Sequence, residues 1–444
     1  MPDFNFVGPS YVAASIYQDD QECINWYPEV DKNKKAENIV SADKRGVIAL
    51  YPTPGLLLRV TLAAGQPVRA LWTIPGGMTL LAVCGNGFYT VNSSFAATLR
   101  GTLSSFSGPV SMTDNGTNAY LVDGQNRYSY TFSTGTFATI AVTDGAFVGG
   151  NKVDIVDNFL VYNNPATQQF GNTNASSTVS GALNFSSADS SPDNLVSLIV
   201  VSRDVFFLKE QVTEVWGDAG LFPVPFQRIS GTSMQHGCAA AFSVARLGEG
   251  AAWLTQDTRG QRVVIRTNGY QPVRISTFAV EQALSSYGTI SDAIGYTYQQ
   301  SGHEFYVLTF PTADATWVYD LATDMWHKRA WRDSNNVLHR HRSNCCAVFQ
   351  NQIIVGDYEN GNLYAFSQSN YTDNGDLIPC VRRCPHLTTD MKNQFFHDLQ
   401  IQFQPGVGLQ KPAQGSTPQA MLTWSDDGGS TWSNQHWAGI GQVG

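Results

Sequence analysis

The sequence predicts an all-β protein built on a β-propeller of six or seven blades. An apolar strand, a Gly-containing turn and a second strand rich in Tyr and Phe recur along the chain. The centres lie roughly 35 to 50 residues apart, which is the spacing of four-stranded propeller blades. The composition agrees, because only 14% of the 444 residues are charged while 40 are glycine, a balance typical of many short strands joined by tight turns.

Three hairpins show the pattern most clearly. In the first, the apolar run Leu80–Val83 leads through Gly85-Asn86-Gly87 into the strand Phe88–Val91, and equivalent hairpins occupy residues 119–130 and 353–366. Asn-Gly and Asp-Gly are strong hairpin signals, because the central residues of a tight hairpin turn must take positive φ. Since such hairpins cannot bury both faces alone, we expect them to stack radially around one axis.

Weaker copies of the pattern lie between the clear ones, at residues 159–163, 205–216, 251–267 and 304–325. The third of these has its turn at Thr258-Arg259-Gly260, and the strand Thr316–Leu321 followed by Trp326 is similar to a kelch blade. Helical spacing of apolar residues occurs only in Thr277–Tyr287, which predicts one short helix between two blades.

The pattern divides the chain into three regions. Residues 1–45 are predicted to form an extended N-terminal arm, residues 46–369 the propeller, and residues 370–444 a C-terminal β-rich region. Alternating apolar residues in His397–Gln404 and Gln419–Trp424 predict that this last region is a small β-sandwich-like domain.

The sharpest short motif lies in the C-terminal region. Ser425, Asp427, Gly429, Thr431 and Trp432 fit the Asp-box pattern S-x-D-x-G-x-T-W. The Asp side chain is expected to accept backbone hydrogen bonds across the turn, and the Trp ring to pack beneath the hairpin. Asp-boxes occur several times in sialidases, whereas this chain has one, so we interpret the motif as structural.

Neither a cofactor nor a metal is predicted. The spacing Cys380-x3-Cys384 with His386 is looser than a zinc knuckle, and no second cysteine pair follows at finger spacing. Adjacent Cys345 and Cys346 would point to opposite faces of a strand. The seven scattered cysteines indicate reduced thiols. The start MPDFNFVGPSYV has neither a basic leader nor a continuous apolar core, so we expect the protein to be made in a cytoplasm.

No catalytic residues are predicted either. The chain has no Gly-x-Ser-x-Gly elbow, Walker loop, His-Glu-x-x-His helix or Gly-x-Gly-x-x-Gly turn. The paired carboxylates Asp19-Asp20 and Asp426-Asp427 sit in apparent turns. The formal charge of −9 argues against broad nucleic-acid affinity, and the basic cluster Lys32, Lys34 and Lys35 reads as a solvated loop. No apolar run reaches the roughly 18 to 20 residues of a membrane span, so no insertion into a membrane is expected.

Several strings spread along the chain carry a resemblance to one family. They are Phe6–Tyr11, Asn25–Glu29, Tyr51–Leu56, Thr213–Trp216, Pro225–Ile229, His236–Ala240, Asn268–Ser276, Val355–Tyr358 and Asn360-Gly361. In these strings the chain resembles the packaged-DNA stabilisation proteins of short-tailed bacteriophages, also called tail accessory or nozzle proteins. The agreement is dispersed over nearly the whole chain.

The resemblance implies a structural, non-enzymatic virion protein of the phage tail. Such a protein assembles in the host cytoplasm as a homohexameric ring below the portal and its adaptor, and extends the DNA channel. It helps retain packaged DNA, which passes through the lumen without sequence-specific binding, and it docks tail fibre, spike or needle proteins. Two alternatives stay open: a sialidase-like enzyme that degrades glycans, and a propeller module that binds a surface glycan without cutting it.

Ring assembly requires a way to reach the next subunit, and the N-terminal arm is the candidate. It carries Tyr11, Tyr17, Trp26 and Tyr27 yet has no obvious partner strand in the sequence, and aromatic side chains are favoured interface anchors. We therefore expect an inter-subunit strap. The alternative is that the arm packs on its own propeller as a closing strand.

Overall fold

The computed structural model describes residues 6–12, 15, 20–30, 48–256, 260–387, 394–404, 410–412 and 416–441. They fall into two compact units. The large unit holds the described residues up to 12 and from 21 to 383, and the small unit holds those between 13 and 20 and from 384 onward.

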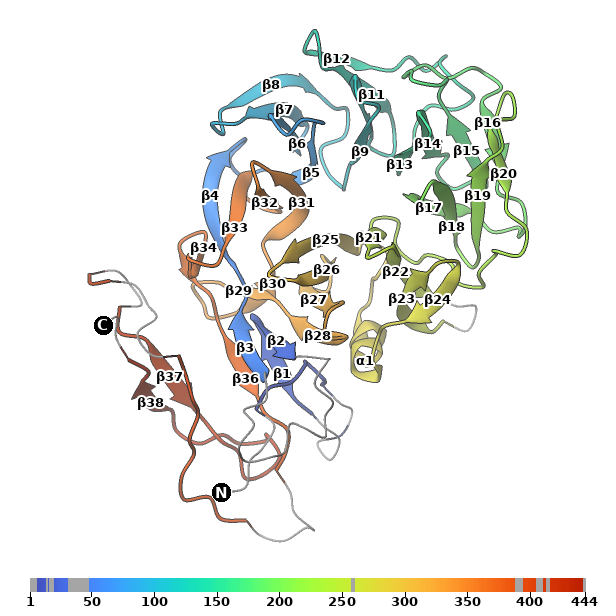
Figure 1. The fold of residues 1–444 in the computed structure, drawn as a ribbon. Coiled ribbons are helices and arrows are strands. Elements are labelled where there is room, and N and C mark those ends of the chain that lie inside the picture. Colours follow the sequence, from blue (N-terminus) through green and yellow to red (C-terminus); the bar gives the residue numbers. More distant parts are fainter. Residues whose placement is uncertain are drawn as a thin grey trace. The chain divides into compact units, whose positions relative to one another are not determined.

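The large unit is a β-propeller, and its described residues form seven blades around a centre (Figure 1). The prediction of six or seven blades is thereby confirmed and fixed at seven. Blades 1 to 5 are four-stranded antiparallel meanders whose strands follow one another in sequence. Blade 1 holds β5 (Val68–Thr73), β6 (Thr79–Cys84), β7 (Gly87–Asn92) and β8 (Ala97–Thr102). Blade 2 holds β9 (Ser111–Asp114), β10 (Asn118–Val122), β11 (Arg127–Thr131) and β12 (Thr136–Thr139).

Blades 3 to 5 continue the meander. Blade 3 holds β13 (Val153–Val156), β14 (Phe159–Asn163), β15 (Gln169–Asn172) and β16 (Phe185–Ser187). Blade 4 holds β17 (Leu195–Val201), β18 (Asp204–Lys209), β19 (Thr213–Asp218) and β20 (Phe226–Arg228). Blade 5 holds β21 (Ala245–Leu247), β22 (Gly250–Gln256), β23 (Arg262–Asn268) and β24 (Gln271–Arg274).

Blades 6 and 7 each carry additional strands. Blade 6 holds β25 (Ile294–Gln300), β26 (His303–Phe310), β27 (Ala315–Asp320) and β28 (Met325–Lys328), extended by β1 (Glu22–Ile24) and β36 (Val381–Arg383). Blade 7 holds β31 (Ser343–Phe349), β32 (Gln352–Asp357), β33 (Asn362–Ser367) and β4 (Gly55–Thr61), extended by β34 (Thr372–Asp373) and β35 (Asp376–Leu377). The remaining pairs are β2 (Trp26–Val30) with β3 (Ile48–Pro52), β29 (Ala330–Arg332) with β30 (Leu338–Arg340), and β37 (Gln419–Leu422) with β38 (His436–Gly439).

The apolar core lies between the blades. In the described residues each neighbouring pair of blades shares a cluster of buried side chains, and the series runs all the way round from blade 1 back to blade 7. Central strands are buried on both faces, so β6 reads as the continuous apolar run TLLAVC. The outer strand β8 is mostly exposed and reads as ATLRGT. Radial stacking therefore buries the second apolar face of each blade, which a single hairpin would leave exposed to solvent.

The circle closes through a strand from the beginning of the chain. β4 pairs antiparallel with β33, in a register that runs from Asn362 opposite Thr61 to Ser367 opposite Gly55. The first propeller strand in the sequence is thus the fourth strand of the last blade, and roughly 300 residues lie between the two partners. Figure 1 shows β4 and β33 side by side.

The predicted helix is confirmed. α1 (Phe278–Ser286) lies between β24 and β25, and the hydroxyl of its N-cap residue Thr277 accepts a hydrogen bond from the backbone N–H of Val280. Val280 and Leu284 are buried in the cluster between blades 5 and 6. Among the described residues α1 is the one helix. At nine residues it is too short to cross a lipid bilayer.

Two expectations need correction. The arm has partner strands: β1 pairs antiparallel with β36 and parallel with β28, and β2 pairs with β3. In the small unit the described residues contain one two-stranded hairpin, β37–β38, rather than a sandwich, and His397–Gln404 is not a strand. The missing strands have a physical reason, since alternating apolar residues form a strand only when a neighbouring strand pairs with it.

Candidate functional site and family

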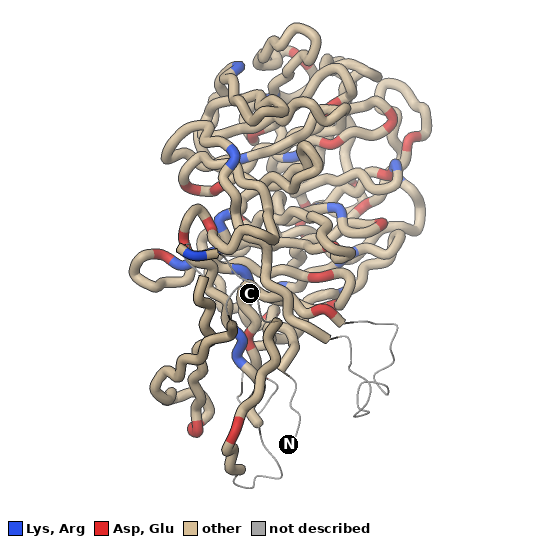
Figure 2. Tube along the Cα trace, turned by 60° about the vertical axis from the view of Figure 1, so that its left-hand side comes forward, with Lys and Arg blue, Asp and Glu red and all other residues tan. Residues whose placement is uncertain are grey.

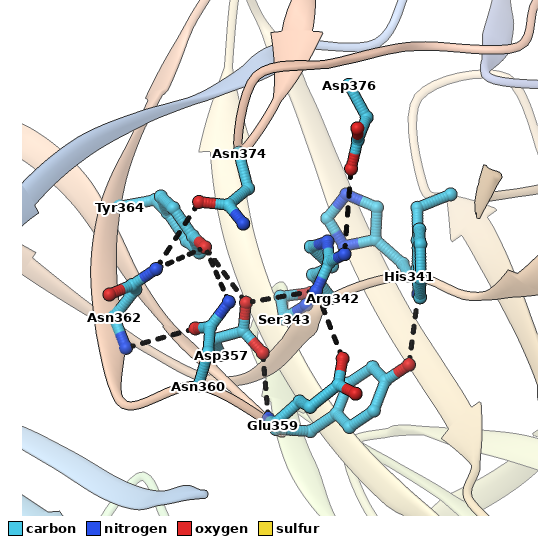
Figure 3. A network of polar contacts seen from close by, with 12 residues as sticks. His341, Arg342, Ser343, Asp357, Glu359, Asn360, Asn362, Tyr364, Asn374 and Asp376 are labelled. Atoms are coloured by element: carbon cyan, nitrogen blue, oxygen red, sulfur yellow. Dashed lines mark hydrogen bonds and ion pairs between the residues drawn. The ribbon is translucent and has the colours of Figure 1, made fainter. Parts of the chain in front are cut away.

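Arg342 is the hub of a polar network beside the closure of the propeller (Figure 3). It directly precedes β31, and its side chain is 6% exposed. Its Nη1 atom lies 3.6 Å from Asp357 Oδ2 and 3.3 Å from Glu359 Oε2, while its Nη2 atom lies 3.8 Å from Asp376 Oδ2. The guanidinium carbon lies 3.8 Å from the centre of the Trp331 ring. One cation thereby connects β32, β35 and β29.

Asp357 extends the network into the β32–β33 turn. Its Oδ2 atom accepts a hydrogen bond of 2.9 Å from the Tyr364 hydroxyl, and its Oδ1 atom accepts one of 2.8 Å from the backbone N–H of Glu359. Burial raises the pKa of Asp357, and the charge of Arg342 opposes that shift. The side chain of Asn362 donates to the Tyr364 hydroxyl at 2.9 Å and to Asn374 Oδ1 at 3.3 Å. The network thus attaches the β34–β35 hairpin to blade 7.

A second polar link joins three blades. Asp154 in β13 accepts hydrogen bonds from the backbone N–H of Val200 in β17 at 2.9 Å and from Arg246 Nη2 at 2.7 Å. Arg246 Nε also donates to the Val200 carbonyl oxygen at 2.9 Å. These residues carry no signal in the sequence, because the partners lie in different blades and share no local motif.

The arm residues fall in different places. Tyr11 forms an isolated antiparallel bridge with Gln21, and Trp26 lies opposite Pro52 in the β2–β3 pair. Tyr27 is 2% exposed and packs edge-on against Phe305, with ring centres 5.2 Å apart. Tyr17 lies outside the described residues. Because Tyr27 is buried in the core of its own chain, the structure corrects its assignment as an anchor for a neighbouring subunit.

Several other sequence features also lie beyond the described residues, namely Asp19, the cluster Lys32, Lys34 and Lys35, and the turn residues Thr258 and Arg259. The adjacent cysteines Cys345 and Cys346 lie in β31, the first strand of the last blade. Among the described residues no group of three or more His, Cys, Asp or Glu side chains is placed to hold a metal ion.

The Asp-box residues form a tight turn between β37 and β38. Asp427 Oδ1 accepts hydrogen bonds from the backbone N–H of Thr431 and from the Ser425 hydroxyl, both at 2.8 Å, and Oδ2 accepts one of 2.6 Å from the Thr431 hydroxyl. Ser425 Oγ accepts the backbone N–H of Gly429 at 2.7 Å. The Trp432 side chain is 49% exposed and therefore does not pack beneath the hairpin as fully as the motif predicts.

These hydrogen bonds lead to a pH prediction. They lower the pKa of Asp427 from 3.8 to about 2. A carboxyl group whose folded pKa is depressed stabilises the turn above the unfolded pKa and loses that contribution as pH falls through the folded pKa. We expect the amide proton of Thr431 to shift in NMR spectra with a midpoint near pH 2, and Asp427→Asn to remove this titration. A Thr431 amide that does not respond between pH 4 and pH 1.5 would contradict the assignment.

The cysteine thiols give a second prediction. Cys23, Cys84 and Cys238 are at most 3% exposed, and burial raises the pKa of Cys238 to about 12. Since the thiolate is the reactive species, we expect these three to resist N-ethylmaleimide in the native protein. All seven cysteines should react in urea, as measured by peptide mass mapping. Rapid native labelling of Cys238 would show that the interface between blades 4 and 5 opens.

The sequence of the chain matches one known protein family. A phage stabilisation family described as "Bacteriophage P22 Gp10, beta-propeller" matches residues 45–371. The chain belongs to this family. The matched span covers the four main strands of each of the seven blades, from before β4 to after β33. The resemblance read from the dispersed strings is therefore confirmed, and the protein is a phage DNA-stabilisation propeller.

Several solved structures are similar to the chain at low sequence identity. The WD40 domain of Neurospora crassa Pan2 is 10% identical with a TM-score of 0.46, and the match covers 72% of this chain and 98% of that one. The N-terminal domain of Nup159 is 10% identical with a TM-score of 0.45, over 71% and 95% of the two chains. The extracellular domain of a putative hybrid two-component system from B. thetaiotaomicron is 9% identical with a TM-score of 0.47, over 70% and 39%. No curated protein matches the chain.

Proposed function

We propose that the protein is a structural, non-enzymatic component of a bacteriophage tail that forms a homohexameric ring below the portal and adaptor. The ring extends the DNA channel, helps retain packaged DNA and provides docking sites for tail fibre, spike or needle proteins. The chain assembles in the host cytoplasm and becomes part of the virion. The observation that carries this proposal is the family match over the whole propeller.

The fold supports an architectural role. The described blades pack their apolar faces against one another. Beside the closure, buried ionic groups such as Arg342 and Asp357 hold neighbouring strands together. A closed disc of this kind is rigid, because each blade is held by two neighbours. Rigidity is what a channel wall under pressure from packaged DNA requires.

The charge supports a channel that DNA passes without binding. The chain has 36 acidic and 27 basic residues, and Figure 2 shows Lys and Arg at scattered positions along the described trace. Affinity for DNA depends on clustered cations that neutralise phosphates. A wall of net negative charge instead repels the DNA backbone.

Electron microscopy of the purified virion tests the proposal directly. The expected result is density for seven-bladed discs in a six-fold ring on the portal axis, below the adaptor. A matched phage that lacks the gene should package DNA and then lose it, as measured by the DNA content of purified heads. Density at any other position, or heads that keep their DNA, would contradict the proposal. Hydrolysis of a host polysaccharide by the pure protein would favour the enzyme alternative.

A further inference from the structure

A lysine is completely buried inside blade 4. Lys209 ends β18, and its side chain is 0% exposed. Its Nζ atom lies 3.2 Å from Asp193 Oδ1 and 3.6 Å from Glu214 Oε1, and it donates a hydrogen bond to the carbonyl oxygen of Ser191. An amine and two carboxyl groups thus meet in a space almost closed to solvent, where the Asp193 side chain is 6% exposed.

The two oxygen atoms of Asp193 have different surroundings. Oδ2 accepts hydrogen bonds from two consecutive backbone N–H groups, that of Gln211 at 2.7 Å and that of Val212 at 3.3 Å. Oδ1 lies 3.2 Å from Lys209 Nζ and faces the lysine. Paired backbone donors on one oxygen stabilise negative charge that develops there when a nucleophile attacks the carbon.

Glu214 is held beside the amine in a fixed orientation. Its side chain is 0% exposed. Its Oε1 atom accepts hydrogen bonds from the backbone N–H of Ser190 at 3.0 Å and from the Ser190 hydroxyl at 2.6 Å. Its Oε2 atom accepts one of 3.1 Å from Trp216 Nε1. A positioned carboxylate within reach of a nucleophilic amine is the arrangement of a proton carrier.

We propose that Lys209 and Asp193 become joined by an intramolecular isopeptide bond, and that Glu214 transfers the protons. The nucleophile, the group that stabilises the oxyanion and the proton carrier are all present in one buried cluster. The proposal concerns the chemistry within a single chain, and it does not depend on the position of the protein in the virion.

The reaction balances without any other reactant. A proton passes from the Lys209 ammonium to Asp193, and the neutral amine attacks the Asp193 carboxyl carbon to form a C–N bond. The negative charge develops on Oδ2, between the two backbone N–H groups. Glu214 takes a proton from the new C–N nitrogen and delivers it to Oδ1, the C–Oδ1 bond breaks, and water leaves. One ammonium and one carboxylate become one amide and one water, and Glu214 returns to its starting form.

The protein environment determines how fast this occurs. Burial raises the pKa of Asp193, but its hydrogen bonds outweigh burial and hold the pKa below the ordinary value. Asp193 is therefore mostly a carboxylate at rest, and the reaction proceeds from the minor fraction of chains in which Asp193 carries the proton. A slow reaction suffices, because it needs to occur once per chain. Burial favours the uncharged amide over a pair of buried ions.

The bond would reinforce the propeller where a blade begins. Residues 193 and 209 enclose the whole of β17 (Leu195–Val201), the first strand of blade 4. A covalent link between them closes this segment into a loop, so β17 cannot be pulled away from β18. Such a link restricts the unfolded chain and resists mechanical unfolding.

The intact mass of the full-length protein tests the proposal. Denatured chains are expected to weigh about 18 Da less than the sequence mass, because one water is expelled. Protease digestion should yield a branched peptide that links Lys209 to Asp193. A chain of unmodified mass, in which Lys209 and Asp193 appear in separate linear peptides, would overturn the proposal and leave a buried ion pair.

Three variants of the full chain identify the participants, each checked for folding by circular dichroism. Lys209→Arg keeps the charge and should show the full sequence mass. Glu214→Gln keeps the size of the side chain and should also show the full mass, because proton transfer is blocked. Asp193→Asn should lose about 17 Da instead, since ammonia replaces water as the leaving group. Loss of water that persists in Lys209→Arg or Glu214→Gln would contradict the assigned roles.

Discussion

Deletion of residues 1–61 is expected to abolish the single cooperative unfolding transition of the propeller. The deletion removes β4, which pairs with β33 over most of its length, and exposes the cluster that Leu56 forms with Val355 and Tyr364. Burial of one leucine contributes about 2 kcal/mol, and each ladder hydrogen bond contributes about 1 kcal/mol. Since a typical domain is stable by only about 5–15 kcal/mol, the open circle should unfold in broad, separate steps, as measured by calorimetry.

Two controls separate closure from truncation. A deletion of residues 1–20 keeps β1 to β4 and should retain a cooperative transition. A synthetic peptide of residues 53–62, added to the larger deletion, should restore cooperativity in a concentration-dependent manner, because binding to the folded state stabilises it. If the 1–61 deletion unfolds at the same temperature and as sharply as the full chain, β4 does not close the circle.

Arg342→Met is expected to reduce the free energy of unfolding by about 3–5 kcal/mol, which is the usual cost of leaving a buried charge without its partner. Methionine keeps an apolar stem against Trp331 but removes the charge that faces Asp357, whose side chain is 0% exposed. Urea denaturation at pH 8 measures the loss. The Asp357 carboxyl can escape by protonation, since its pKa is already raised in the folded protein. A raised carboxyl pKa favours folding at lower pH, so the loss should be smaller at pH 5.

Arg203→Met is the matched control. Arg203 lies 2.8 Å from Asp157, closer than any of the carboxylates around Arg342, but its side chain is 79% exposed. Exposed ion pairs contribute little because water screens them. The urea midpoint of Arg203→Met should therefore stay at that of the parent protein. Equal losses in the two variants would show that burial of the network around Arg342 does not determine its contribution.

The local elements of the fold could be predicted from the sequence. The hairpin at residues 80–91 became β6 and β7, that at 353–366 became β32 and β33, and the helical spacing after Thr277 became α1. These predictions succeed because strand alternation, turn φ values and helical periodicity are set by residues close together in the chain. Some turns gave no signal. Gln350 and Asn351 both take positive φ between β31 and β32, although neither is glycine.

The networks could not be predicted in the same way. The string Val355–Tyr358 helped to indicate the family, but the contact of Asp357 with Arg342 depends on β31 and β32 lying side by side. Lys209, Asp193 and Glu214 are ordinary charged residues in the sequence. They became a candidate reaction site only because the fold buries them together. Burial of a particular lysine cannot be predicted from sequence, because most lysines are exposed.

The sequence by itself therefore determined that the chain is an all-β propeller of a phage stabilisation family, because repeating hairpins and dispersed strings are properties of neighbouring residues. The tertiary structure alone decided the number of blades, the closure of the circle by β4, and the packing of Tyr27 on its own chain. The physical reason is distance along the chain. Nothing in the sequence of a strand near residue 55 indicates that it pairs with a strand near residue 365. They meet only because seven twisted sheets, each covering its neighbours, return the last blade to the place where the first one begins.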